Sequence, residues 1–172
     1  MMGAMTSTIR NLHALWIIVY CVIITVAFGL QIFEHEEPCP LCYLQRIAML
    51  LVCLAAAMNL VFGIRTYHYA LVIVASLFGG GTAIRQILLH ICPGFTQFGI
   101  PFWGLSLYTW SFLTFVGSLT ATAIFLALYR EDQRQKIELN LFEQIAIGWF
   151  ALVVCGNIVS SLIDCGLGAC RG

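Results

Sequence analysis

The chain has 172 residues, of which 61% are hydrophobic and 9% charged, and its formal net charge at pH 7 is zero. This composition is far more apolar than that of soluble domains, and the balanced charge predicts no nucleic-acid-binding surface. The sequence therefore predicts an integral membrane protein that is surrounded by membrane lipid.

Five apolar stretches are each close to the roughly 20 residues that a helix needs to cross the hydrocarbon core of a membrane. They are residues 12–33, 44–64, 69–89, 108–129 and 141–163. The first is longer than the apolar part of a signal peptide, which has about 7 to 15 residues, so we expect it to remain as a span. The predicted fold is all-α, with residues 1–172 forming a single membrane domain.

The basic residues predict the orientation, because short loops rich in Lys and Arg stay in the cytoplasm. Arg10 precedes the first stretch, Arg65 lies between the second and third, and Arg130, Arg134 and Lys136 follow the fourth. We therefore expect the N-terminus in the cytoplasm and the C-terminus on the outer side. The outer segments would be the loops 34–43 and 90–107 and the tail 164–172.

The eight cysteines divide between the membrane interior and the outer side. Within the apolar stretches lie Cys21, Cys53 and Cys155, which we expect to be buried packing residues, since buried thiols are common and inert. On the outer side lie Cys39, Cys42, Cys92, Cys165 and Cys170. Disulfides persist in oxidising compartments, so this asymmetry favours thiol chemistry at the outer face.

The segment "EEPCPLCYLQR", residues 36–46, places a Cys-x-x-Cys pair at the start of the second stretch. The unpaired amides and the dipole of a helix N-terminus favour a thiolate at Cys42. Arg46 follows one helical turn later on the same face, where its permanent charge would stabilise a thiolate or a developing oxyanion. An arginine inside a membrane span is costly unless it has a partner or reaches the interface, so we treat it as a candidate functional residue.

Two other interpretations of this segment remain open. His35, Cys39 and Cys42, with Glu34, Glu36 or Glu37, could supply ligands to zinc. A purely structural disulfide is the other alternative, although closing so short a loop removes little chain entropy.

The motif "PCPLCYLQR", together with "GLSLYTWSF" further along the chain, resembles the DsbB family of bacterial inner-membrane proteins. The resemblance runs from about Gln31 to Tyr129 and implies a four-helix transmembrane bundle, to which this chain adds a fifth helix. It implies a quinone-dependent thiol oxidase that reoxidises a periplasmic thioredoxin-like donor of the DsbA type and passes electrons to membrane quinone, either ubiquinone or menaquinone.

The resemblance also implies roles for the matched positions. Cys39 and Cys42 would be the pair next to the quinone, with Cys42 the sulfur that contacts the quinone ring. Arg46 would polarise a quinone oxygen, and His90, near the outer end of the third stretch, would be a second quinone contact.

The chain departs from the family in its second cysteine pair. Members of the family carry that pair in the second outer loop, where this chain has only Cys92, and the tail "DCGLGACRG" after the fifth stretch has no counterpart. We infer that Cys165 and Cys170 replace the missing pair as catalytic residues. The alternatives are a passive terminal disulfide, two free thiols, or pairing of Cys92 with one tail cysteine.

Other polar and small residues in the spans have simpler interpretations. Gly79, Gly80 and Gly81 favour close helix packing, or space for a quinone. Arg85 and Gln86 are expected to extend towards the outer interface, and Glu143 to lie at the inner interface. Two competing functions remain, a membrane metal-binding or metal-delivery protein that uses His35 and the outer cysteines, and a thiol electron carrier working in the reductive direction.

Overall fold

The computed structural model describes residues 2–33, 39–91, 103–129 and 138–165, with the side chains of 2–6, 164 and 165 excepted. It contains five helices: α1 (Met2–Phe33), α2 (Pro40–Phe62), α3 (Thr66–Ile91), α4 (Leu107–Ala127) and α5 (Leu141–Cys165). All five are long and apolar enough to cross a membrane. The prediction of an all-α fold with five membrane-spanning helices is confirmed.

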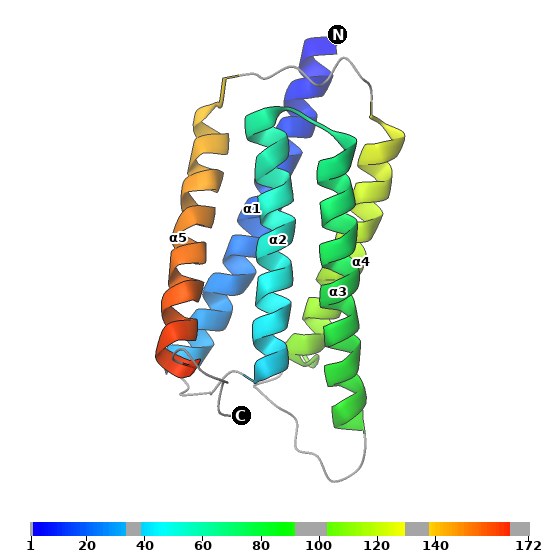
Figure 1. Ribbon diagram of the computed structural model, residues 1–172. Helices are drawn as coiled ribbons and strands as arrows, with labels where there is room; N and C mark the ends of the chain where they lie inside the picture. Colours follow the sequence, from blue (N-terminus) through cyan, green and yellow to red (C-terminus); the bar gives the residue numbers. More distant parts are fainter. Residues whose placement is uncertain (1, 34–38, 92–102, 130–137, 166–172) are drawn as a thin grey trace.

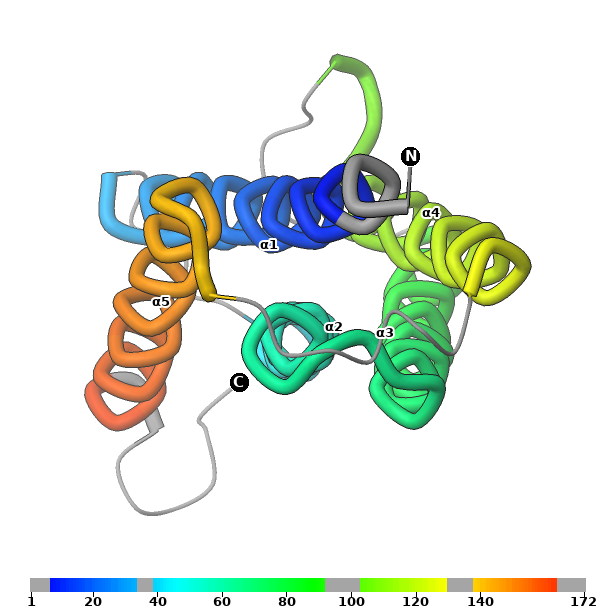
Figure 2. Tube along the Cα trace, turned by 90° about the horizontal axis from the view of Figure 1, so that it is seen from above, coloured from blue at the N-terminus to red at the C-terminus, as the bar shows by residue number. Residues whose placement is uncertain are grey.

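The helices run alternately up and down, so five of their ends meet at one end of the bundle (Figure 1). There α1 ends, α2 begins, α3 ends, α4 begins and α5 ends; we call this the cysteine end, because Cys39 lies next to the start of α2. α2 packs between α1 and α3, α4 packs on α3, and α5 packs on α1 and touches α2 (Figure 2).

A glycine lets α3 and α4 approach closely. A Cβ atom added at Gly79 would collide with the ring of Phe115 on α4, whereas one added at Gly81 would meet nothing within 4 Å. Phe115 itself is 1% exposed. The expectation of close helix packing therefore holds at Gly79, where a ring occupies the space that a side chain would need.

Polar side chains join the helices at the end opposite the cysteines. Arg10 on α1 forms an ion pair with Glu143 on α5, with 2.7 Å between Nη2 and Oε2, and its Nη1 donates to the carbonyl of Leu60. Glu143, expected at the interface, is 1% exposed. It also caps α5, because Glu143 and Asn140 each accept a hydrogen bond from the other's backbone N–H. The pair thus fixes the start of α5 against α1.

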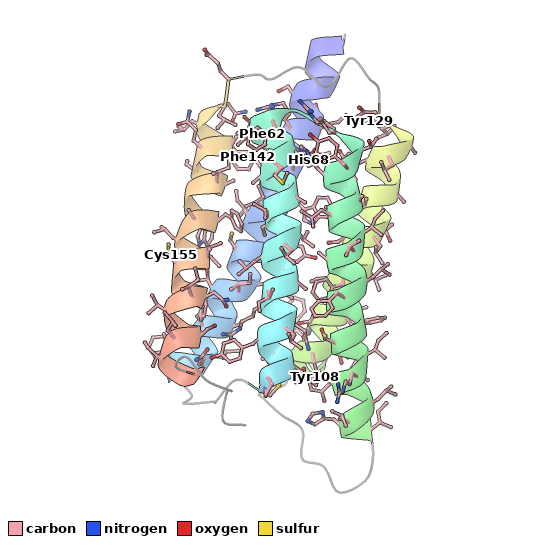
Figure 3. All side chains as sticks on the ribbon, viewed as in Figure 1. Phe62, His68, Tyr108, Tyr129, Phe142 and Cys155 are labelled. Atoms are coloured by element: carbon pink, nitrogen blue, oxygen red, sulfur yellow. The ribbon has the colours of Figure 1, made fainter. Side chains whose placement is uncertain are left out.

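The three cysteines expected in the core do not behave alike. Cys21 and Cys53 are buried, as predicted, at 0% and 1% exposure. Cys155 is exposed, so that prediction is wrong. The reason is that α5 sits at the edge of the bundle and packs mainly on α1, which leaves Cys155 on the outer edge of the helix (Figure 3).

Candidate redox site

The first turn of α2 brings the Cys39 and Cys42 sulfurs together. Cys39 is the N-cap, in extended conformation, and Pro40 occupies the first helical position, where its fixed φ suits a helix and its missing N–H costs nothing. The backbone N–H of Cys42 donates both to the carbonyl of Cys39, at 2.9 Å, and to its sulfur, at 3.3 Å. The two sulfurs are 2.8 Å apart and only partly buried.

The hydrogen bond between the two thiols has a direction. The hydrogen bond to Cys42 and then burial raise the pKa of the Cys39 thiol well above its usual range. Cys39 therefore keeps its proton and can donate a hydrogen bond to the Cys42 sulfur. This arrangement leaves Cys42 as the sulfur from which nucleophilic attack would come.

A glutamine from α3 contacts both sulfurs. Gln86 Nε2 lies 3.3 Å from the sulfur of Cys39 and 3.5 Å from that of Cys42. Its Oε1 accepts a hydrogen bond of 2.7 Å from Gln45 Nε2 on α2, and both amides are buried, at 2% and 4% exposure. The second amide fixes the orientation of the first, so that Gln86 presents its donor group to the cysteines.

The expectation that Gln86 extends to the interface is therefore wrong, although its neighbour Arg85 is exposed. Successive helical residues differ by about 100° in direction, so Arg85 and Gln86 face different surroundings. The available signal was that Gln45 and Gln86 are polar amides inside apolar spans, which are expensive there and usually functional.

Arg46 lies one turn beyond Cys42 and is directed towards α1. Its Nη1 donates to Gln31 Oε1 at 2.9 Å and its Nη2 to the carbonyl of Ala27 at 3.4 Å. The guanidinium lies over the ring of Phe28, 4.8 Å from its centroid, and 5.7 Å from that of Tyr43. At 8% exposure, this cation is held inside the bundle by hydrogen bonds and aromatic faces.

His90 lies one turn after Gln86 on α3. Its Nδ1 is 2.7 Å from the carbonyl oxygen of Gln86, and its ring stacks on that of Tyr108, with 5.1 Å between centroids. Tyr108 lies in the first turn of α4, near the cysteine end (Figure 3). Because a carbonyl can only accept, Nδ1 carries the proton, and Nε2 of the neutral ring is an acceptor.

Several predicted site residues lie outside the described part of the chain. These undescribed residues are Cys92, Cys170, His35 and the three glutamates near His35. The side chain of Cys165 is likewise not described. The backbone of Cys165 ends α5 at the cysteine end. The tail relay and the zinc alternative thus stay predictions, and within the described ranges no three His, Cys, Asp or Glu side chains gather as metal ligands would.

Comparison with known proteins gives one family. The family model described as "Disulfide bond formation protein DsbB" matches residues 9–96. This range includes Cys39, Cys42, Arg46, Gln86 and His90. α4 and α5 lie beyond the matched range.

Curated relatives named disulfide bond formation protein B are similar over about half of the chain. The protein of Burkholderia pseudomallei (strain 1106a) is 32% identical over 91 residues, 51% of this chain and 53% of the relative. That of Burkholderia thailandensis is 33% identical over 51% of this chain and 53% of its own length, and that of Hahella chejuensis 38% over 50% and 54%. The chain thus spans about half the length of these relatives. No solved structure matches the chain.

Proposed function

The chain belongs to the DsbB family of disulfide bond formation proteins, and from this premise we propose that it is a quinone-dependent thiol oxidase of the bacterial inner membrane. It takes two electrons from a reduced thioredoxin-like protein of the DsbA type and delivers them to membrane quinone. Its cysteine end faces the periplasm, as the distribution of basic residues predicts.

The observation that carries this proposal is the contact of two sulfurs at the mouth of a membrane-spanning helix. Cys39 and Cys42 lie 2.8 Å apart, so the pair can alternate between dithiol and disulfide with little movement of the backbone. Gln86 donates to both sulfurs, which favours the reduced form because thiols and thiolates accept hydrogen bonds better than a disulfide does. A pair favoured in its reduced form is an oxidant of other thiols.

The residues around the pair fit a lipid-soluble acceptor. A quinone bound beside Cys42 would take up the two electrons and two protons that the dithiol gives up, and would leave as quinol. Arg46 provides a permanent charge one turn below Cys42 that can bind a quinone oxygen. His90 Nε2 lies at the same end of the bundle as an acceptor or, when protonated, a donor.

The partner would reach this site through the tail. A thiolate of the reduced partner attacks the Cys165–Cys170 disulfide and forms a mixed disulfide, with one tail thiolate as the leaving group. The partner's second thiolate then attacks the mixed disulfide and displaces the other tail thiolate, so the partner leaves oxidised and the tail reduced. The tail dithiol then reduces the Cys39–Cys42 disulfide by the same two exchanges. Cys165 and Cys170 carry electrons in this scheme and touch no quinone.

Turnover with defined components tests the proposal. Purified full-length protein in lipid nanodiscs would be mixed with a reduced DsbA-type protein and a short-chain ubiquinone, and both donor thiols and quinol would be measured. Wild type should form one quinol for each pair of thiols consumed, and Cys39→Ser or Cys42→Ser should abolish this. Cys155→Ser is the matched control, since Cys155 is exposed on α5.

Three further measurements test the tail relay and separate the competing functions. Loss of turnover in a Cys165→Ser, Cys170→Ser double variant would support the relay, and full turnover would remove the tail from it. Stoichiometric zinc in the purified protein, with no quinol formed by wild type, would replace the thiol oxidase by a metal-binding protein. Reduction of the oxidised partner by added quinol, without the forward reaction, would reverse the direction of electron flow.

A further inference from the structure

Two residues of α1 hold the guanidinium of Arg46. Gln31 Oε1 accepts its hydrogen bond at 2.9 Å, and the ring of Phe28 lies beneath it at 4.8 Å. Both are spaced one helical turn apart on α1, so they form one surface against which the cation rests. The position of Arg46 therefore depends on the position of these two side chains.

α5 contacts the same two residues from the other side. Ser160 Oγ accepts a hydrogen bond of 3.2 Å from Gln31 Nε2. A Cβ atom added at Gly156, one turn earlier on α5, would lie 3.8 Å from Cε2 of Phe28. α5 thus meets α1 at the level of Arg46, with a hydroxyl on Gln31 and a glycine beside Phe28.

This part of α5 turns polar groups towards the bundle. Asn157, between Gly156 and Ser160, is 6% exposed, and its Oδ1 makes no hydrogen bond to the residues that the structure describes. The two residues that follow it, Ile158 and Val159, are apolar and strongly exposed, at 54% and 55%. Asn157 and Ser160 thus face the bundle, while Ile158 and Val159 form an apolar outer surface. Polar side chains in a membrane-spanning helix normally face other helices and contact polar groups there.

We propose that α5 is a positioning element for Arg46, acting through Gln31. The amide of Gln31 has a donor end and an acceptor end. Ser160 takes the donor end, which leaves the acceptor end facing the guanidinium; the reversed amide would set N–H groups against N–H groups. Gly156 lies beside the ring of Phe28, where an added Cβ atom would make an ordinary contact of 3.8 Å. This inference rests on the proposed function, in which Arg46 contacts the quinone. It assigns the positioning of Arg46 to α5, a helix that lies beyond the residues matched by the family model.

The first test compares serine variants that differ by one position. Ser160→Ala removes the hydroxyl that Gln31 contacts, Ser160→Thr keeps a hydroxyl, and Ser161→Ala is the matched control, since the Ser161 side chain has no hydrogen bond within the described part of the chain. Gln31→Leu removes the link itself. Each full-length variant is assayed in nanodiscs for the KM of short-chain ubiquinone and for the quinone-independent rate at which reduced partner exchanges with the protein.

We expect the quinone step alone to respond. Because small displacements of a positioning group are costly, the KM for quinone should rise roughly fivefold to tenfold in Gln31→Leu and about threefold in Ser160→Ala. Ser160→Thr should lie within about twofold of wild type, like Ser161→Ala. Partner exchange should not change in any variant. A Ser160→Ala protein with the KM of Ser161→Ala would overturn the inference, as would an equal loss in both steps, which indicates general damage.

A second measurement needs neither partner nor quinone. The rate at which a membrane-permeant maleimide alkylates reduced Cys42 at pH 7 depends on the nearby cation, and should fall about threefold in Gln31→Leu and Ser160→Ala but not in Ser161→Ala. If wild type forms no quinol while this pattern appears, the proposed function fails and the positioning role of α5 stands. If alkylation is the same in all variants, the positioning role fails even where quinol is formed.

Discussion

Replacing Gln86 by leucine should make the Cys39–Cys42 pair a weaker oxidant. The substitution removes one Nε2 group that lies 3.3 and 3.5 Å from the two sulfurs. A net hydrogen bond is worth about 1 kcal/mol to a neutral acceptor and about 1.5 to 3 kcal/mol to a charged one. At 30 mV for each 1.4 kcal/mol of a two-electron couple, the potential should fall by about 20 mV for a thiol and about 30 to 60 mV for a thiolate.

The potential would be measured by equilibrating the protein with dithiothreitol buffers and counting alkylated thiols on the Cys39–Cys42 peptide. Gln86→Leu also leaves Gln45 Nε2 without its 2.7 Å acceptor, a cost common to both redox states, so stability should fall without contributing to the shift. A Gln45→Leu, Gln86→Leu protein should recover stability and keep the lower potential. Gln144→Leu, an exposed glutamine of α5, is the control. A potential unchanged from that of wild type would refute the role assigned to Gln86.

Three other changes have outcomes that follow from the geometry. Cys42→Ala removes the hydrogen bond that raises the pKa of Cys39, so this pKa should fall. More Cys39 thiolate should then be present at pH 8, and Cys39 should be alkylated faster than in the reduced wild type. An unchanged alkylation rate would argue against the hydrogen bond. Glu143→Leu leaves the buried guanidinium of Arg10 without its carboxylate and should lower the free energy of unfolding by about 3 to 5 kcal/mol. The loss should appear as a lower thermal midpoint in detergent. A midpoint equal to that of wild type would contradict the ion pair. Gly79→Ala should destabilise the bundle by about 1 to 3 kcal/mol because its methyl group meets an aromatic ring, while Gly81→Ala should be neutral; equal midpoints for the two would mean that α3 and α4 are further apart.

Hydropathy was sufficient for the fold, because each helix of the bundle is long and uniformly apolar. It missed the first turn of α2, which begins at Pro40 rather than at residue 44. The cap made by Cys39 and the proline at the first position form that turn, and their signal is local geometry rather than apolar content. The Cys39–Cys42 pair could be predicted because its Cys-x-x-Cys spacing is itself a local pattern of the sequence.

The contacts of the site with other helices could not be predicted in this way. Gln86 was grouped with Arg85 by depth in the membrane, although the two face different directions on α3. Spacing relates Arg46 only to neighbours on its own helix, such as Cys42 four residues earlier, whereas its hydrogen-bond acceptor is Gln31, 15 residues away on α1. Gln31 in turn meets Ser160 across 129 residues, and no local pattern reports such a pair.

The ion pair at the far end of the bundle has a consequence for biosynthesis. Arg10 is synthesised 133 residues before Glu143, which at 5 to 20 residues per second is a delay of roughly 7 to 27 s. During this interval the nascent chain carries an uncompensated guanidinium near one membrane surface, and a ribosome that stops before the last helix releases a product that never loses it. The ion pair that joins the start of α5 to α1 can therefore form only once the last helix has been inserted.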